Sequence, residues 1–228
     1  MIINVSNSEM SLVVSAISWV ITGLWVWLRG WQVQRHYLAQ IERAALSRTA
    51  VTWTSALVGA AFLIATQERP GTAAVVVVSM VGVISSWVDI RTHRLPSVYT
   101  RVMFLGVLVG IGTFFLTEGT EAWERVLFAS VGALLWGIPF FVAYKVHTGV
   151  GFGDVKLAPV MGALVGMLGI EPALAALVFA FISAGFAALW LLITGSTSAN
   201  SRMAMGPWML GAAILAHLFW DAVPKSLF

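Results

Sequence analysis

Residues 72–90 read TAAVVVVSMVGVISSWVDI, an apolar run with one charged side chain, Asp89, next to its end. A helix needs about 20 predominantly apolar residues to cross the hydrocarbon core of a bilayer. The run therefore predicts a membrane-spanning helix that ends in a carboxylate. Because an ionisable group is costly to keep at the edge of a membrane, Asp89 is a candidate functional residue whose partner has to be identified.

The whole chain has the composition of a membrane protein. Of its 228 residues, 59% are hydrophobic and only 10% are charged, whereas a soluble domain carries about 25% charged residues. Lipid cannot satisfy open backbone groups, and no run alternates as a barrel strand would, so the spans are predicted to be helical. We predict an all-α polytopic membrane protein with about eight transmembrane helices. The apolar segments are Ser11–Leu28, Val51–Thr66, Thr72–Ile90, Val102–Leu116, Val126–Tyr144, Val155–Ile170, Ala173–Thr194 and Met205–Trp220.

Basic residues in the predicted loops orient these segments. With the N-terminus outside, ten of the 13 Lys and Arg residues fall inside, as the positive-inside rule requires. Both termini are then external, and residues 1–228 form a single membrane domain with a short basic cytoplasmic loop at 29–50. That loop is most simply a basic amphipathic helix on the anionic inner leaflet, with substrate docking as the alternative. Among the acidic residues, only Glu42, Asp89 and Asp154 fall inside.

Several function classes are excluded by composition and charge placement. The chain has no cysteine, which excludes disulfides, thiol nucleophiles and iron–sulfur clusters. Its pI near 9.7 follows from the cytoplasmic loops, so we expect no nucleic-acid partner. The first ten residues contain no basic residue, so the first apolar run is predicted to be a permanent span and not a cleaved signal.

A second carboxylate lies in residues 147–162, HTGVGFGDVKLAPVMG, where Asp154 follows a glycine-rich turn and precedes an apolar run. The predicted topology places Asp154 at the same membrane surface as Asp89, which belongs to WVDIRTHRLPS at 87–97. Two adjacent carboxylates share a proton, so that one member can activate water while the other polarises a peptide carbonyl. Gly151 and Gly153 would let a peptide backbone come close to Asp154.

Helix capping is the alternative explanation for Asp154, because a carboxylate is favoured at a helix N-terminus. Asp89 lacks this explanation, since a carboxylate at the end of a helix faces the negative end of the dipole. Arg91 and Arg94 are candidates to offset its charge. Spacing alone leaves both interpretations open: a catalytic pair, or a cap with an interfacial charge.

Both stretches carry a family resemblance. GFGDVKL resembles the G-x-G-D-x-K pattern of bacterial type IV prepilin peptidases and archaeal preflagellin peptidases, and DIRTHRLP resembles their other signature, an Asp followed six residues later by an aliphatic residue and then Pro. The resemblance implies a GxGD-class aspartic endopeptidase in the cytoplasmic membrane. Such enzymes cleave basic leaders from prepilin-like precursors at the cytoplasmic face, in pilus assembly and protein secretion.

The resemblance also implies roles for particular residues. Asp89 and Asp154 would be the catalytic pair, Gly151 and Gly153 would shape the site, and Lys156 and Pro96 belong to the two motifs, with no metal and no cofactor. This chain has Ser97 where the family often has Asn. The larger members insert a four-cysteine cytoplasmic domain after the first span and methylate the new N-terminus, so the absence of cysteine here implies a compact form that acts as a peptidase only.

Three other functions use the same residues in different ways. A metal site formed by Asp89, His93 and His147 lacks a motif such as H-E-x-x-H. A transporter or channel would use the carboxylates for ion or proton coupling, but such sites lie near the bilayer midplane. A non-catalytic assembly subunit would tolerate Asp→Asn at both positions. The inner face is itself basic, so a basic leader finds little acidic surface there beyond the pair and Glu42.

Overall fold

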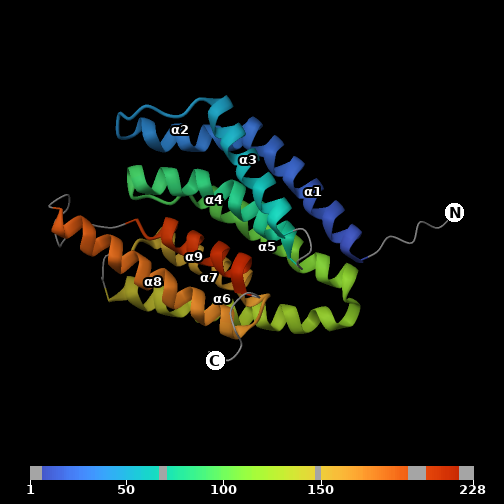
Figure 1. The fold of residues 1–228 in the computed structure, drawn as a ribbon. Helices are drawn as coiled ribbons and strands as arrows, with labels where there is room; N and C mark the ends of the chain where they lie inside the picture. Colours follow the sequence, from blue (N-terminus) through green and yellow to red (C-terminus); the bar gives the residue numbers. More distant parts are fainter. Residues whose placement is uncertain (1–6, 67–70, 147–149, 195–203, 221–228) are drawn as a thin grey trace.

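A computed structural model describes residues 7–66, 71–146, 150–194 and 204–220 of the chain. Helices make up nearly all of these residues and no strand occurs among them, which confirms the all-α prediction (Figure 1). The helices are α1 (Asn7–Trp25), a π-helix η1 (Val26–Gly30), α2 (Trp31–Ala39), α3 (Arg48–Thr66), α4 (Thr72–Thr92), α5 (Ser97–Thr117), a 3-10 turn η2 (Gly119–Glu121), α6 (Ala122–Lys145), α7 (Phe152–Gly166), α8 (Ile170–Ile193) and α9 (Gly206–Phe219).

Each predicted apolar segment lies on a helix, but the helices differ in length. Six helical stretches in the described part of the chain are long and apolar enough to cross a membrane, counting Asn7–Ala39 as one. α7 and α9 are shorter, with 15 and 14 residues. At 1.5 Å per residue they extend only about 21–23 Å, against a hydrocarbon core of about 30 Å. The multi-pass prediction is confirmed for six candidate spans.

α4 forms the centre of the bundle. Every residue from Thr72 to Gly82 is buried, and the helix packs against α1, α3, α5 and α9. A helix that is apolar on all sides is suited to such a position, because it has no polar face to turn outward. In Figure 1, α4 and α5 lie between α1 and α3 on one side and α6 to α9 on the other.

Glycines four residues apart, a sequence pattern that predicts close helix packing, allow the closest helix contacts. A Cβ at Gly106 of α5 would lie 2.5 Å from Val77 of α4, and one at Gly110 would lie 2.6 Å from Ala74. On the other side of the bundle, a Cβ at Gly162 of α7 would overlap the backbone carbonyl of α6. These contacts fix the positions of α5 and α7, two of the helices that begin near the carboxylates.

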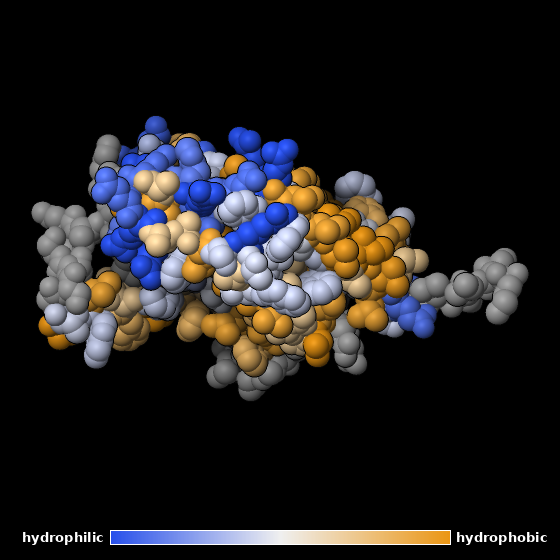
Figure 2. Space-filling model, turned by 90° about the horizontal axis from the view of Figure 1, so that it is seen from above, coloured by the Kyte–Doolittle hydropathy of each residue, from blue (hydrophilic) through white to orange (hydrophobic). Residues whose placement is uncertain are grey.

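The predicted loop at 29–50 is largely helical. After η1 the chain continues as α2, which packs on α4 and buries Gln34 and Leu38. The segment is therefore largely helical, as the amphipathic-helix interpretation predicted, and one face of α2 packs on the bundle while the other stays exposed. We call the end of the bundle formed by α2, the C-terminus of α4 and the N-termini of α5, α7 and α9 the site end. In Figure 2, hydrophilic side chains gather over the end that carries α2, and hydrophobic side chains dominate beyond it.

The opposite end of the bundle joins other helix termini. The Asn7 side-chain amide at the start of α1 donates a hydrogen bond to the Thr117 carbonyl at the end of α5, at 2.9 Å. The guanidinium of Arg125, near the start of α6, lies 3.3 Å from the Glu118 carboxylate and donates to the Met167 carbonyl after α7 at 3.4 Å. Consecutive long helices therefore run in alternating directions, as a multi-pass chain requires.

Candidate active site

The turn between α4 and α5 places Asp89 in the last turn of α4, where only 3% of the residue is exposed. α4 ends at His93, which has a left-handed φ of 49° and donates its backbone N–H to the Asp89 carbonyl at 2.8 Å. The backbone of Pro96 is extended, with φ −63° and ψ 121°, and α5 starts at the next residue. A proline cannot continue the preceding helix but is suited to begin the following one. The motif DIRTHRLP thus forms a tight corner between two helices.

Asp154 lies in the first turn of α7 and is 6% exposed. Its Oδ2 accepts a hydrogen bond from the Gly151 backbone N–H at 3.1 Å, closing a capping box at the helix start. The predicted capping role is therefore real, but it engages only one carboxylate oxygen. Gly153 serves a close contact between the two motifs, because a Cβ there would lie 2.8 Å from Leu95 Cβ. This approach brings Asp154 next to the corner that carries Asp89.

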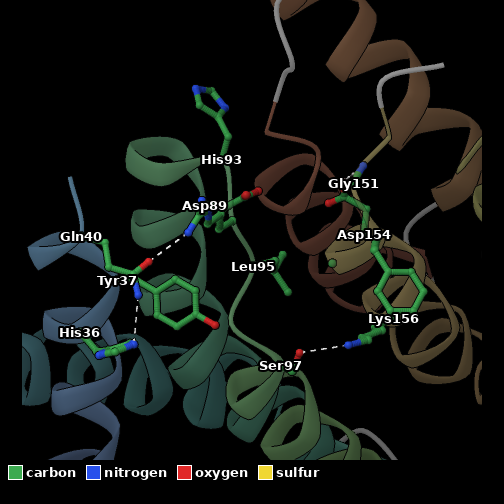
Figure 3. Close-up of a pocket in the computed structure, with 13 residues that line it drawn as sticks. His36, Tyr37, Gln40, Asp89, His93, Leu95, Ser97, Gly151, Asp154 and Lys156 are labelled. Carbon is green, nitrogen blue, oxygen red and sulfur yellow. Dashed lines mark hydrogen bonds between the residues drawn. The ribbon is translucent and has the colours of Figure 1, made fainter. Parts of the chain in front are cut away.

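A pocket of about 430 Å³ opens at the site end and contains both carboxylates. Asp89 and Asp154 both line it, and in Figure 3 the Asp89 carboxylate points toward the side that carries Gly151 and Asp154. Five of the six predicted site residues line it, and Pro96 instead shapes the corner beneath. The lining residues are His36, Tyr37, Gln40, Asp89, His93, Arg94, Leu95, Ser97, Gly151, Phe152, Gly153, Asp154 and Lys156.

The two carboxyl groups interact electrostatically. Asp154 lies outside the six candidate spans, and its pKa is raised to about 7, chiefly by burial and further by the negative charge of Asp89. The hydrogen bond from the Gly151 backbone opposes this rise. Because a second ionisation beside an existing negative charge is unfavourable, a pair in this setting retains a proton near neutral pH.

Gly206, which the sequence analysis did not identify, holds the second carboxylate. Its backbone N–H donates to Asp89 Oδ2 at 3.1 Å from the first residue of α9. The positive end of the α9 dipole thus faces Asp89. This helix start stabilises the Asp89 carboxylate, a structural role that the sequence did not predict. The Gly-Pro sequence at 206–207 signals a helix start, but it does not indicate which carboxylate that start faces.

Lys156 joins two helices at the pocket rim. Its Nζ donates a hydrogen bond to the Ser97 hydroxyl at 3.2 Å and lies 4.6 Å from the centre of the Phe152 ring. Ser97 is the position where the family pattern often has Asn, so the expected difference in local hydrogen bonding takes the form of a contact to Lys156. This bond links the start of α5 to the first turn of α7.

α2 supplies three lining residues that the sequence analysis did not assign to the site: His36, Tyr37 and Gln40. Arg94 Nη1 donates to Gln40 Oε1 at 3.0 Å, and the Gln40 amide nitrogen lies 3.1 Å from His36 Nε2. These contacts place part of the segment at 29–50 beside the carboxylates. The only sequence signal was the mixture of basic, polar and aromatic residues in that loop.

Among the described residues, no group of three or more His, Cys, Asp or Glu side chains is arranged to hold a metal ion. His93 lines the pocket, but its ring points away from Asp89 in Figure 3. His147, the third residue of the metal alternative, lies outside the described residues.

The fold and the site together define the class of protein. It is an all-helical, multi-pass membrane protein with a pair of buried carboxylates in a pocket at one end of the bundle. A sequence model of the type IV leader peptidase family matches residues 75–193, just over half of the chain, and includes both aspartates. The chain belongs to the type IV leader peptidase family. Membership implies an aspartic peptidase that processes prepilins. No curated protein and no solved structure matched the chain.

Proposed function

We propose that this protein is a membrane aspartic endopeptidase whose catalytic pair is Asp89 and Asp154, and that it removes basic leader peptides from prepilin-like precursors. One observation carries the assignment. Two buried carboxylates from separate motifs line a single pocket, where the negative charge of Asp89 raises the pKa of Asp154. Family membership supports the reaction class.

The chemistry requires the pair to hold one proton. The ionised carboxylate takes a proton from a water molecule, whose oxygen forms a bond to the scissile carbonyl carbon, while the protonated carboxyl donates to the carbonyl oxygen. The tetrahedral intermediate is a neutral diol, and its collapse breaks the C–N bond. The departing nitrogen receives a proton from the pair, and one hydroxyl of the diol returns its proton to the pair as the new carbonyl forms. Water has then been added across the peptide bond, and the pair returns to its singly protonated state.

The proposed setting is the cytoplasmic face of the cytoplasmic membrane. The basic loops favour placing the site end inside and both termini outside, with residues 1–228 acting as one domain. The carboxylates lie at the C-terminal end of α4 and the N-terminal end of α7. A transporter would place them near the middle of its spans, so the position of the pair disfavours ion or proton coupling.

The decisive experiment co-expresses the protein with a prepilin-like precursor from the same genome. The wild type should shorten the precursor by its leader, whereas Asp89→Asn and Asp154→Asn should each reduce processing by at least about 10³-fold, because a pair with one carboxylate cannot both activate water and donate a proton. Immunoblots of precursor size and of membrane-inserted protease measure the two quantities. Glu42→Gln is the matched control, since Glu42 is exposed and does not line the pocket. Full processing by either Asp variant would refute the two-aspartate mechanism.

A further inference from the structure

The pocket has a second wall opposite the glycine motif. Figure 3 shows α2 on one side, with His36, Tyr37 and Gln40, and the first turn of α7 on the other, with the carboxylate of Asp89 between them. The Tyr37 side chain reaches from α2 toward the corner at Leu95 and Ser97. A chain segment that reaches both carboxylates from the site end therefore passes between α2 and α7.

α2 is held rigidly in this position. The Tyr99 hydroxyl of α5 donates to the Gly30 carbonyl at 2.9 Å in a buried contact, at the end of the π-helix that joins α1 to α2. A π-helix interrupts the regular helical hydrogen-bond pattern and is frequent at functional sites. From α3, the Arg48 guanidinium lies 3.8 Å from the centre of the Trp27 ring and donates to the Trp27 carbonyl at 2.7 Å. Contacts from two other helices thus fix the direction of α2 before any ligand binds.

The charges of the pocket limit what can enter it. Arg94 and Lys156 are cationic, and His36 and His93 also line the space, whereas Asp89 and Asp154 are the only acidic residues in the lining. A basic side chain near the scissile bond would meet two cations and an acidic pair that holds one proton. An uncharged segment avoids this repulsion, and its backbone can bind the Tyr37 hydroxyl and the N–H of the Gln40 amide that is not directed at His36.

We propose that α2 is the peptide-docking wall of this site, and that Tyr37 and Gln40 bind the backbone of an extended, uncharged segment flanking the scissile bond. The basic part of the leader remains outside the pocket. This inference rests on the proposed function and extends it to residues that precede the family match at 75–193. Tyr37 and Gln40 act on substrate affinity and selectivity, while the two aspartates carry the chemistry.

Cross-linking tests the wall independently of turnover. The chain has no cysteine, so Gln40→Cys combined with Asp154→Asn gives one thiol on an inactive protein that retains its substrate. Single cysteines placed in the precursor beside the cleavage site should link to Gln40→Cys through a short bifunctional maleimide. Gln32→Cys is the control, because Gln32 is exposed, does not line the pocket and lies about 12 Å further along the helix axis. Equal cross-linking at positions 32 and 40 would overturn the inference, whether or not the wild type cleaves.

Kinetics test the roles of the two side chains. Gln40→Ala and Tyr37→Phe should each raise KM by about 3- to 10-fold, the value of one lost hydrogen bond, with kcat within about twofold of the wild type. Gln32→Ala should leave both constants unchanged. Gln40→Glu should improve cleavage of a precursor with Lys placed beside the scissile bond, since it adds an acid to the wall. An unchanged KM in both Gln40→Ala and Tyr37→Phe would refute the peptide-docking role of α2. It would leave the two-aspartate mechanism unaffected.

Discussion

At the residue scale, the two aspartates have matching environments. Each accepts one backbone N–H at 3.1 Å from the start of a helix, Asp89 from Gly206 of α9 and Asp154 from Gly151 of α7. Two helix dipoles therefore place their positive ends on the pair and offset part of the cost of burying negative charge. These donors engage one oxygen of each carboxylate and fix how the pair is oriented across the pocket.

Gly206→Ala should disturb the pair without removing a carboxylate. Its Cβ would lie 2.7 Å from both Asp89 Oδ2 and Leu95 Cδ1, so Asp89 or α9 must shift. We expect kcat for leader cleavage to fall about 10- to 100-fold with little change in KM, because small misplacements of catalytic groups have effects of that size. Gly211→Ala on the same helix is the control, since its Cβ meets nothing within 4 Å. Wild-type kcat in Gly206→Ala would show that this contact does not position Asp89.

At the element scale, α7 is located by backbone contact with α6. Gly132 and Gly162 face one another so closely that a Cβ on either would overlap the carbonyl of the other. Small residues permit such approach, and dispersion contacts between backbones then stabilise the pair in lipid. Trp136 of α6 adds a hydrogen bond from its indole N–H to the Ala173 carbonyl of α8, at 2.9 Å. The position of Asp154 depends on this packing although it lies two turns away from Gly162.

Gly162→Ala should separate α6 from α7. Its Cβ would also lie 2.8 Å from Trp136 Cβ, so the protein should lose about 1–3 kcal/mol of stability, the usual effect of overpacking. Thermal unfolding in detergent measures the loss, and slower leader cleavage should accompany it as Asp154 moves. Gly185→Ala in α8 provides the comparison, because its Cβ meets open space. Equal unfolding temperatures for the two variants would contradict this account of the helix pair.

At the scale of the whole molecule, the short helices make the site end concave. α7 and α9 start at the pocket and are both shorter than α4 and α5, which have 21 residues each. The start of α7, the corner after α4 and α2 line a hollow that contains both aspartates, and the start of α9 contacts Asp89 beside it. Peptide hydrolysis needs water, and this shape admits water from the end of the bundle while lipid covers its sides.

The proposed orientation can be measured with single thiols. Ala44→Cys lies at the site end and Thr120→Cys at the opposite end, and both positions are exposed. In intact cells a membrane-impermeant maleimide should label Thr120→Cys, whereas Ala44→Cys should react only after the membrane is opened, because basic loops are retained on the cytoplasmic side. The cysteine-free parent chain gives the background. The reverse labelling pattern would place the site outside and contradict the proposed cytoplasmic action.

The sequence alone determined the properties that depend on neighbouring residues. Hydropathy over about 20 residues is a local sum, so it identified the helical membrane bundle and the segments that form it. The spacing around Asp89 and Asp154 was also local, and it indicated the family that the match over residues 75–193 confirms. Four-residue glycine spacing predicted close helix packing for the same reason.

Only the tertiary structure decided which helix ends meet. The bond from Gly206 to Asp89 joins residues 117 positions apart, the bond from Lys156 to Ser97 spans 59, and the bond from Arg94 to Gln40 spans 54. No local pattern encodes such pairs, because they depend on how whole helices pack and on where each one ends. For the same reason the sequence indicated an amphipathic helix at α2 but did not indicate that His36, Tyr37 and Gln40 would line the pocket.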